Sequence, residues 1–364
     1  MTNTARAAIL ETSPGELVIG EVEVGDVGPR EVLVRTTAAG LCHSDLHFMQ
    51  GLYPYMLPMV SGHEAAGVVE SVGDEVTDFR VGDHVVSCVS GFCGACRWCL
   101  TGRPYLCDKV GITRGFEGTP SLTRDGERVF PFFELGCFAE LMLVHEHFLV
   151  KVRDEIPLEK AALIGCGVTT GVGAVLNTAS VRAGDTVAVI GCGGIGLNAI
   201  QAARLAGAAR VIAVDRLGSK LVLAQQFGAS DVVDASADDP VAAVIELTGS
   251  GVDHAIEAIG LKVTAEQAFA MLGKDGTATI IGMVPFGQKL ELDATQLLGG
   301  KRIQGSNMGS NRFRIDIPRY VDWYLDGRLE LDALVSGTMP LTQINEGFAA
   351  LAAGDVARQL VTFD

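Results

Sequence analysis

A glycine-rich turn between a predicted strand and a predicted helix constrains the fold of this chain more than any other feature. The strand covers residues 186–190, the helix covers residues 197–206, and the turn carries the pattern G-x-G-x-x-G. The first glycine permits a tight turn, the second lets a ligand approach the backbone, and the third lets strand and helix pack closely. The pattern therefore predicts a βαβ unit in which the free N–H groups at the start of the helix face an anion.

Short segments continue to alternate beyond this turn. A strand at 211–214 and a helix at 219–227 come next, followed by segments at 230–233, 241–247, 254–258, 265–271 and 277–281. Strands that alternate with helices of roughly ten residues are typical of doubly wound domains. We therefore expect an α/β fold with a doubly wound parallel sheet in this part of the chain.

The same region predicts dinucleotide binding. The expected contacts to a pyrophosphate are Gly191, Gly193, Gly194, Ile195 and Gly196. Asp215 lies 19 residues after Gly196, at the end of the next strand, where a carboxylate can accept hydrogen bonds from an adenosine ribose. Its charge would repel a 2′-phosphate and so favours NAD, whereas the neighbouring Arg216 keeps NADP open as an alternative.

The chain before and after this region has a different character. The part up to about residue 151 is predicted to be an irregular all-β domain, because Gly- and Pro-rich turns separate short strands such as 31–35, 66–70 and 83–87. Small residues give the next segment, 159–177, a helical tendency. Beyond residue 308 we expect two helices and a strand, at 317–325, 344–354 and 359–363.

Length and charge limit the classes of partner. The 364 residues, 48% of them apolar, suffice for two or three domains. Because 44 acidic residues face 28 basic ones, the formal charge is −16, which argues against binding to nucleic acid or to an anionic membrane. The first residues lack the apolar core of a signal peptide, so we expect a cytoplasmic protein. Glycines and polar residues interrupt the two long uncharged windows, 161–181 and 186–203, which favours burial over a membrane span.

Four closely spaced cysteines form a candidate metal site. They follow the pattern C-x2-C-x2-C-x7-C and are Cys93, Cys96, Cys99 and Cys107. Four thiolates at such intervals can close a tetrahedron around zinc, and such a closed site is structural. The spacing differs from that of bacterial iron–sulfur proteins. Disulfide bonds are the alternative, which the expected compartment disfavours.

The other thiols are less informative by themselves. Cys42 and Cys166, like His63, could be ordinary buried residues or metal ligands. Cys88, Cys137 and Cys192 are expected to pack as small apolar groups.

Five motifs together resemble the zinc-dependent medium-chain alcohol dehydrogenases, in the same order and over essentially the whole chain. They are the Cys42-His-Ser-Asp45 string, Gly62-His-Glu64, the four-cysteine loop, Cys166 followed by Gly-Val-Thr-Thr-Gly171, and the glycine turn. The resemblance implies a GroES-like catalytic domain formed by residues 1–167 and 308–364. It also implies a Rossmann domain formed by residues 168–307.

The resemblance also implies roles for residues near a catalytic zinc ion. Its three protein ligands match Cys42, His63 and Cys166, so that the chain would hold two zinc ions, one catalytic and one structural. Asp45 matches the acid that orients the ligand histidine, and Glu64 matches a carboxylate that can transiently enter the coordination sphere. The proton of the alcohol would leave through residues that match Ser44 and His47.

The implied reaction is reversible oxidation of an alcohol to an aldehyde or ketone, with hydride transfer to NAD. Further cofactor contacts are implied near the nicotinamide, at the adenosine ribose and at the phosphates, and they match Thr170, Lys220, Arg358 and His43. A neutral histidine at position 43 would hold the reduced cofactor less tightly than the arginine of many relatives.

Spacing from the zinc ligands suggests an alcohol pocket lined by Tyr53, Val89, Phe132, Phe133 and Leu298. These residues supply no Lys or Arg for a carboxylate, and Val89 stands where ethanol-specific relatives carry a large aromatic. We therefore expect medium-length or aromatic primary alcohols as substrates. A glutathione-linked formaldehyde dehydrogenase and a non-enzymatic zinc-ribbon adaptor are the alternatives.

The family also forms oligomers. Its members associate through an edge of the Rossmann domain, which corresponds to residues 280–303 here. The insert at 110–134 resembles that of longer, often dimeric members. We expect a homodimer or a homotetramer.

Overall fold

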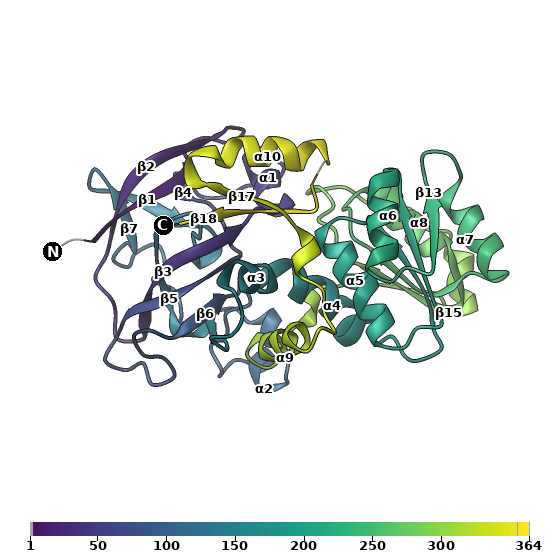
Figure 1. Cartoon of the computed structure of the whole chain (residues 1–364), viewed down its shortest axis with the longest axis horizontal. Helices are drawn as coiled ribbons and strands as arrows, with labels where there is room; N and C mark the ends of the chain where they lie inside the picture. Colours follow the sequence, from purple (N-terminus) through teal and green to yellow (C-terminus); the bar gives the residue numbers. More distant parts are fainter. Residues whose placement is uncertain (1–2, 355, 364) are drawn as a thin grey trace. The chain divides into compact units, whose positions relative to one another are not determined.

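The computed structural model describes residues 3–354 and 356–363 and divides the chain into two compact units. The first unit comprises Met1–Cys166 and Arg312–Asp364, and the second comprises Gly167–Asn311. In Figure 1 the first unit holds the purple and blue part of the chain and its yellow end, and the second holds the teal and green part.

The first unit is β-rich. Its closed barrel consists of β1 (Asn3–Leu10), β2 (Leu17–Val24), β7 (Leu122–Arg124), β8 (Glu127–Pro131) and β4 (Met59–Val60). A second sheet has the order β10 (Leu149–Lys151), β6 (His84–Ser87), β5 (Ala65–Val72), β3 (Glu31–Gly40), β18 (Arg358–Thr362) and β17 (Val335–Pro340), with β9 (Leu141–His145) paired to β3. Alternate residues of β1, namely Ala5, Ala7 and Ile9, enter the barrel core, as the two-residue period of a strand requires.

Helices of the first unit include α1 (His43–Met49), α2 (Arg97–Leu100), α3 (Leu158–Leu163), α9 (Phe313–Leu325) and α10 (Ile344–Ala353). Helix α9 begins earlier than the expected residue 317. The Asp316 carboxylate accepts the Arg312 N–H at 2.8 Å, which supplies a partner for a backbone group at the helix start. Pro318 therefore lies inside the helix.

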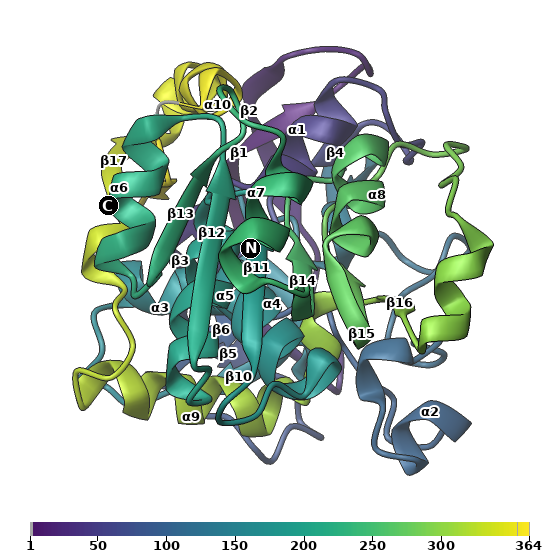
Figure 2. The same ribbon diagram turned by 90° about the vertical axis from the view of Figure 1, so that its right-hand side faces the viewer.

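The second unit contains a six-stranded parallel sheet. Its order is β13 (Asp231–Asp234), β12 (Arg210–Asp215), β11 (Thr186–Ile190), β14 (Val252–Glu257), β15 (Leu272–Ile280) and β16 (Arg302–Gly305), and Figure 2 shows the strands following one another in this order. The connecting helices are α5 (Gly194–Leu205), α6 (Gly218–Gln226), α7 (Pro240–Thr248) and α8 (Lys262–Ala270). The expectation of a doubly wound sheet is confirmed. Chain order reverses between β11 and β14, which is where such folds bind ligands.

One helical stretch, Leu158–Ala179, is long and apolar enough to cross a membrane by length and composition alone. Its most apolar window is 83% buried inside the protein, so the stretch is a helix of the core. This agrees with the expectation of burial that was based on its glycines and polar residues. The other uncharged window forms β11, the glycine turn and α5.

Candidate active site

Three segments of the first unit bring Cys42, His63 and Cys166 together. Cys42 lies between β3 and α1, His63 lies between β4 and β5, and Cys166 lies in the π-helical segment Ile164–Val168. Their ligand atoms all lie within 4.8 Å of one another, and the residues are 2%, 2% and 4% exposed. Single π-helical turns are rare and frequently occur at functional positions.

The spacing of these atoms suits a metal ion. The Cys166 Sγ lies 3.3 Å from the Nε2 of His63. Zinc bonds of about 2.3 Å to sulfur and about 2.0–2.1 Å to nitrogen would place tetrahedral ligand atoms roughly 3.5 Å apart. Three protein ligands are the number found in catalytic zinc sites, where the fourth position takes water or substrate.

Asp45 fixes the orientation of His63. One Asp45 carboxylate oxygen lies 3.1 Å from the Nδ1 of His63 and accepts the Gly62 N–H at 3.2 Å. This contact directs Nε2 of the imidazole towards the thiols, an arrangement common to metal-bound histidines. Burial lowers the pKa of His63, but the neighbouring Asp45 and Cys42 outweigh burial and raise that pKa well above its ordinary value.

The two thiols of the cluster differ in acidity. A hydrogen bond from Cys166 and the nearby charges of His63 and Arg358 hold the pKa of Cys42 well below its ordinary value, against the effect of burial. The Cys166 thiol donates a hydrogen bond to Cys42 and is buried, and both effects raise its pKa well above the ordinary value. Binding of a divalent metal would displace the remaining proton.

A buried ion pair lies beside the cluster. The guanidinium of Arg358 is 3.5 Å from the Glu64 carboxylate and donates a hydrogen bond to the Leu41 carbonyl oxygen at 3.2 Å. Glu64 is 0% exposed and Arg358 is 4% exposed. The structure thus places Arg358 against Glu64, and its contact with a cofactor phosphate stays a prediction.

Helix α1 carries Ser44 and His47, three residues apart and hence on one face. The Ser44 hydroxyl oxygen lies 3.7 Å from the Cys42 sulfur. The half-buried ring of His47 stacks on Tyr53 with the centroids 6.2 Å apart. Burial lowers the pKa of His47, so its imidazole is neutral near pH 7. His43, also on α1, is exposed.

Aromatic side chains line the other side of His63. The rings of Phe132 and Phe133, on the short 3-10 helix η2 (Phe132–Glu134), meet the imidazole edge-on at centroid distances of 5.7 and 5.9 Å. Phe48 of α1 contacts both rings, at 4.8 and 5.7 Å. Tyr55 also packs on this group.

Two other predicted pocket residues have no aromatic ring. Val89 is half-buried just beyond β6, and Leu298 of the second unit is 91% exposed. Sequence reasoning missed Phe48 and Tyr55, because no spacing signal shows that rings from different segments converge. Only the proximity of Tyr55 to the predicted pocket residue Tyr53 could have suggested it.

The four-cysteine loop forms a second cluster in the first unit. The sulfur atoms of Cys93, Cys96, Cys99 and Cys107 all lie within 4.8 Å of one another. The Cys96 sulfur is 3.6 Å from the Cys99 sulfur and 3.8 Å from the Cys107 sulfur. A disulfide would need about 2.05 Å, whereas a zinc tetrahedron with bonds of about 2.3 Å places sulfurs roughly 3.8 Å apart. All nine cysteines are free thiols. The backbone N–H of Cys99, together with hydrogen bonds from the other three thiols, lowers the pKa of Cys96 to about 6, which favours the thiolate that metals bind.

In the second unit the glycine turn leaves room for a ligand. Gly191 has φ 91°, and a Cβ at Gly196 would lie 1.7 Å from the Gly191 carbonyl oxygen, so both positions require glycine. A Cβ at Gly193, in contrast, would meet no atom of the described chain within 4 Å. Packing within the chain therefore does not explain this glycine, and its approach to a pyrophosphate stays a prediction.

Asp215 is the last residue of β12, and its carboxylate contacts the glycine turn. Its carboxylate oxygens accept the N–H groups of Cys192 at 2.8 Å and of Leu217 at 3.0 Å. Arg216 is exposed and Lys220 is half-buried nearby in sequence. Thr170 is 5% exposed, and its hydroxyl donates to the Met308 sulfur at 3.5 Å.

Comparison with known proteins identifies both parts of the chain. Residues 28–154 match the alcohol dehydrogenase GroES-like domain, and residues 194–325 match the zinc-binding dehydrogenase domain. Alcohol dehydrogenase class-3 of Drosophila melanogaster is 37% identical over 99% of this chain and 98% of its own length. Putative alcohol dehydrogenase D of Mycobacterium tuberculosis is 41% identical, and S-(hydroxymethyl)glutathione dehydrogenase of Synechocystis is 37% identical, each over 99% of this chain and 100% of its own length.

Solved structures agree with these relatives. The benzyl alcohol dehydrogenase of Acinetobacter calcoaceticus superposes with a TM-score of 0.94 at 34% identity and covers both chains completely. A zinc-binding dehydrogenase of Sinorhizobium meliloti bound to NADP superposes with a TM-score of 0.82 at 29% identity, over 99% of this chain and 100% of its own. The chain therefore belongs to the zinc-dependent medium-chain alcohol dehydrogenase family and is an oxidoreductase.

Proposed function

We propose that the protein oxidises medium-length or aromatic primary alcohols reversibly to aldehydes, with NAD as the hydride acceptor. The observation that carries this proposal is the buried cluster of Cys42, His63 and Cys166, which offers three zinc ligands next to Ser44 and His47. A benzyl alcohol dehydrogenase among the similar structures supports an aromatic substrate.

The residues of this chain divide the work of the reaction. When bound, zinc supplies a Lewis acid at the alcohol oxygen and NAD accepts the hydride. Asp45 holds His63 in the orientation that a ligand needs. The Ser44 hydroxyl can take the alcohol proton and pass it towards the imidazole of His47, which is neutral and therefore able to accept it.

The chain is proposed to bind two zinc ions, a catalytic one and a structural one at Cys93, Cys96, Cys99 and Cys107. We propose residues 1–167 and 308–364 as the catalytic domain and residues 168–307 as the Rossmann domain. A cytoplasmic homodimer or homotetramer, associated through residues 280–303, is the assembly that we propose.

The function is tested by following NADH formation with a panel of alcohols, with and without glutathione. We expect turnover of hexanol and benzyl alcohol in the absence of glutathione. Activity with formaldehyde that requires glutathione would instead support the alternative function, which the name of the Synechocystis relative keeps open.

Substitution of Asp215 should weaken discrimination between cofactors. Because its carboxylate would face the 2′-phosphate of NADP, we expect the wild-type protein to prefer NAD by at least about tenfold in kcat/KM. Asp215→Ser should reduce that ratio, whereas Asp234→Ser, at the end of the neighbouring strand β13, should leave it unchanged. Equal kcat/KM values for both cofactors in the wild-type protein would refute the assignment.

The proton path predicts a pH dependence. Burial lowers the pKa of His47 below its ordinary value of 6.5, so its ability to accept a proton is present above that lowered pKa and is lost as pH falls through it. Alcohol oxidation should therefore fall on the acidic side, and His47→Gln should slow it at neutral pH and remove that limb of the profile. The control is His84→Gln, on β6 of the same unit. A His47→Gln variant with the wild-type rate and profile would exclude this path.

Narrowing the pocket should change substrate preference. Each buried methylene of a longer alcohol can add up to about 0.8 kcal/mol of binding, so we expect hexanol and benzyl alcohol to exceed ethanol in kcat/KM. Val89→Phe should penalise these alcohols more than ethanol, whereas Val81→Phe, at a position that is 67% exposed, should not. If the wild-type protein favours ethanol, the wide apolar pocket does not exist.

A further inference from the structure

The turn that carries Phe133 has an unusual backbone. Phe133 has φ 50° and Glu134 has φ 66°, so two successive non-glycine residues adopt the left-handed region. Bulky side chains rarely do so, and such a conformation persists only where surrounding contacts impose it. The contacts around η2 therefore determine where the ring of Phe133 lies.

The hydroxyl of Tyr55 supplies one such contact. Its oxygen accepts the Phe133 N–H at 2.8 Å and lies 3.5 Å from the Pro131 carbonyl oxygen, to which it can donate. The Tyr55 ring packs edge-on against Phe132 at 5.1 Å and against Phe133 at 5.9 Å. A single phenol thus holds the backbone on both sides of the turn.

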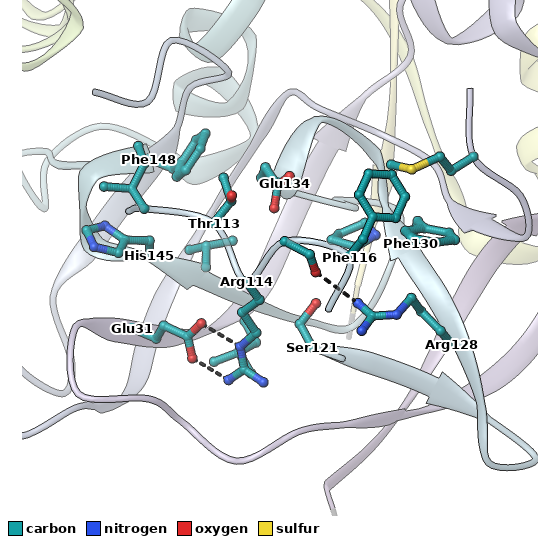
Figure 3. Close-up of a pocket in the computed structure, with 16 residues that line it drawn as sticks. Glu31, Thr113, Arg114, Phe116, Ser121, Arg128, Phe130, Glu134, His145 and Phe148 are labelled. Carbon is teal, nitrogen blue, oxygen red and sulfur yellow. Dashed lines mark hydrogen bonds and ion pairs between the residues drawn. The ribbon is translucent and has the colours of Figure 1, made fainter. Parts of the chain in front are cut away.

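Free space lies beside this turn. A cavity of about 230 Å³ is lined by Phe130, Pro131 and Glu134 from β8 and η2 and by Met56, the neighbour of Tyr55. Figure 3 shows Phe130 and Glu134 among the side chains around this cavity. Because Pro131 and Glu134 line this space, the turn has room to shift if the hydrogen bond of Tyr55 is lost.

We propose that Tyr55 is a positioning residue for substrate selection, whose hydroxyl holds η2 so that the Phe133 ring lies against His63. The inference rests on the proposed function and on the prediction from the sequence that Phe132 and Phe133 line the alcohol pocket. Aromatic alcohols are large enough to use these rings, whereas ethanol is not. Tyr55 therefore acts on the binding of bulky alcohols through Phe133 and not on the chemical step.

The test is Tyr55→Phe, which removes only the hydroxyl oxygen. We expect the KM for benzyl alcohol to rise about fivefold, which corresponds to the typical net free energy of one hydrogen bond. The kcat, the zinc content and the KM for ethanol should stay within about twofold of wild type. Tyr324→Phe is the matched control, because Tyr324 lies on α9 and its hydroxyl oxygen is 3.3 Å from a carboxylate oxygen of Asp332. An unchanged ratio of the two KM values in Tyr55→Phe would overturn the proposal.

A second measurement needs no variant and no substrate. Amide hydrogen exchange of the wild-type protein should show the Phe133 N–H protected, because it donates to Tyr55. Exchange at the rate of an unstructured amide would overturn the proposal even if Tyr55→Phe failed to fold. If the wild-type protein oxidised no alcohol, the proposed function would fail while the exchange measurement still tested the bond itself.

Discussion

Cys42→Ala should abolish alcohol oxidation and remove one zinc ion per chain while the fold persists. The thiol is one of three protein ligands in a buried cluster, and two remaining ligands hold a metal poorly. Loss of a Lewis acid removes several kcal/mol of stabilisation from the transition state, which corresponds to at least about a thousandfold in kcat. Activity assays and metal analysis of freshly purified protein measure both effects.

The control for this variant is Cys88→Ala, since Cys88 is also a buried thiol, at 0% exposure, but belongs to neither cysteine cluster. It should keep both zinc ions and most of the activity. Two zinc ions in Cys42→Ala, or one or none in the wild-type protein, would contradict the assignment of the two sites.

Cys99→Ala should mainly lower the stability of the protein and leave the catalytic zinc site in place. Structural zinc sites contribute folding free energy directly, about 10–16 kcal/mol in isolated zinc-finger peptides. Even a loss of about 5 kcal/mol would lower the apparent Tm by roughly 10–20 °C in a unit of this size. Thermal unfolding followed by circular dichroism measures the shift, and metal analysis should show that the catalytic zinc remains.

Leu100→Ser provides the matched comparison, because Leu100 is the next residue on α2, is 74% exposed and is not a ligand. It should leave the Tm and the zinc content unchanged. A Cys99→Ala protein as stable as Leu100→Ser would show that the four-cysteine loop is not a structural metal site.

The α/β part of the fold was predictable because its signals are local. Apolar runs and the glycine turn place β11, α5 and β12 within a few residues of their observed bounds. The start of α5 at Gly194, before the expected residue 197, reflects the glycine turn itself, whose last residues already form the first helical turn. Sequence patterns do not fix such boundaries, because turn and helix share the same glycines.

The candidate site was predictable only where residue type and spacing carry chemistry. Spacing alone pointed to Cys93, Cys96, Cys99 and Cys107, whereas Cys42, His63 and Cys166 were predicted through the resemblance to the family. No comparable signal linked Glu64 to Arg358, which are far apart in sequence and meet only because β18 pairs with β3. The hydrogen bond between Tyr55 and Phe133 likewise depends on a left-handed backbone that the residues Phe-Phe-Glu would not suggest.

The pairing of β18 with β3 also sets an order of assembly during synthesis. Leu360 pairs with Gly40 in a sheet of the first unit, so this unit is finished only after the whole second unit has left the ribosome. A nascent chain that stops before residue 358 still contains all seven cysteine and histidine residues of the two clusters. It lacks the guanidinium that neutralises Glu64, and it exposes an edge of β3 to aggregation and to chaperones. A chain truncated before residue 358 therefore keeps both sets of candidate metal ligands in its sequence, although its sheet is incomplete.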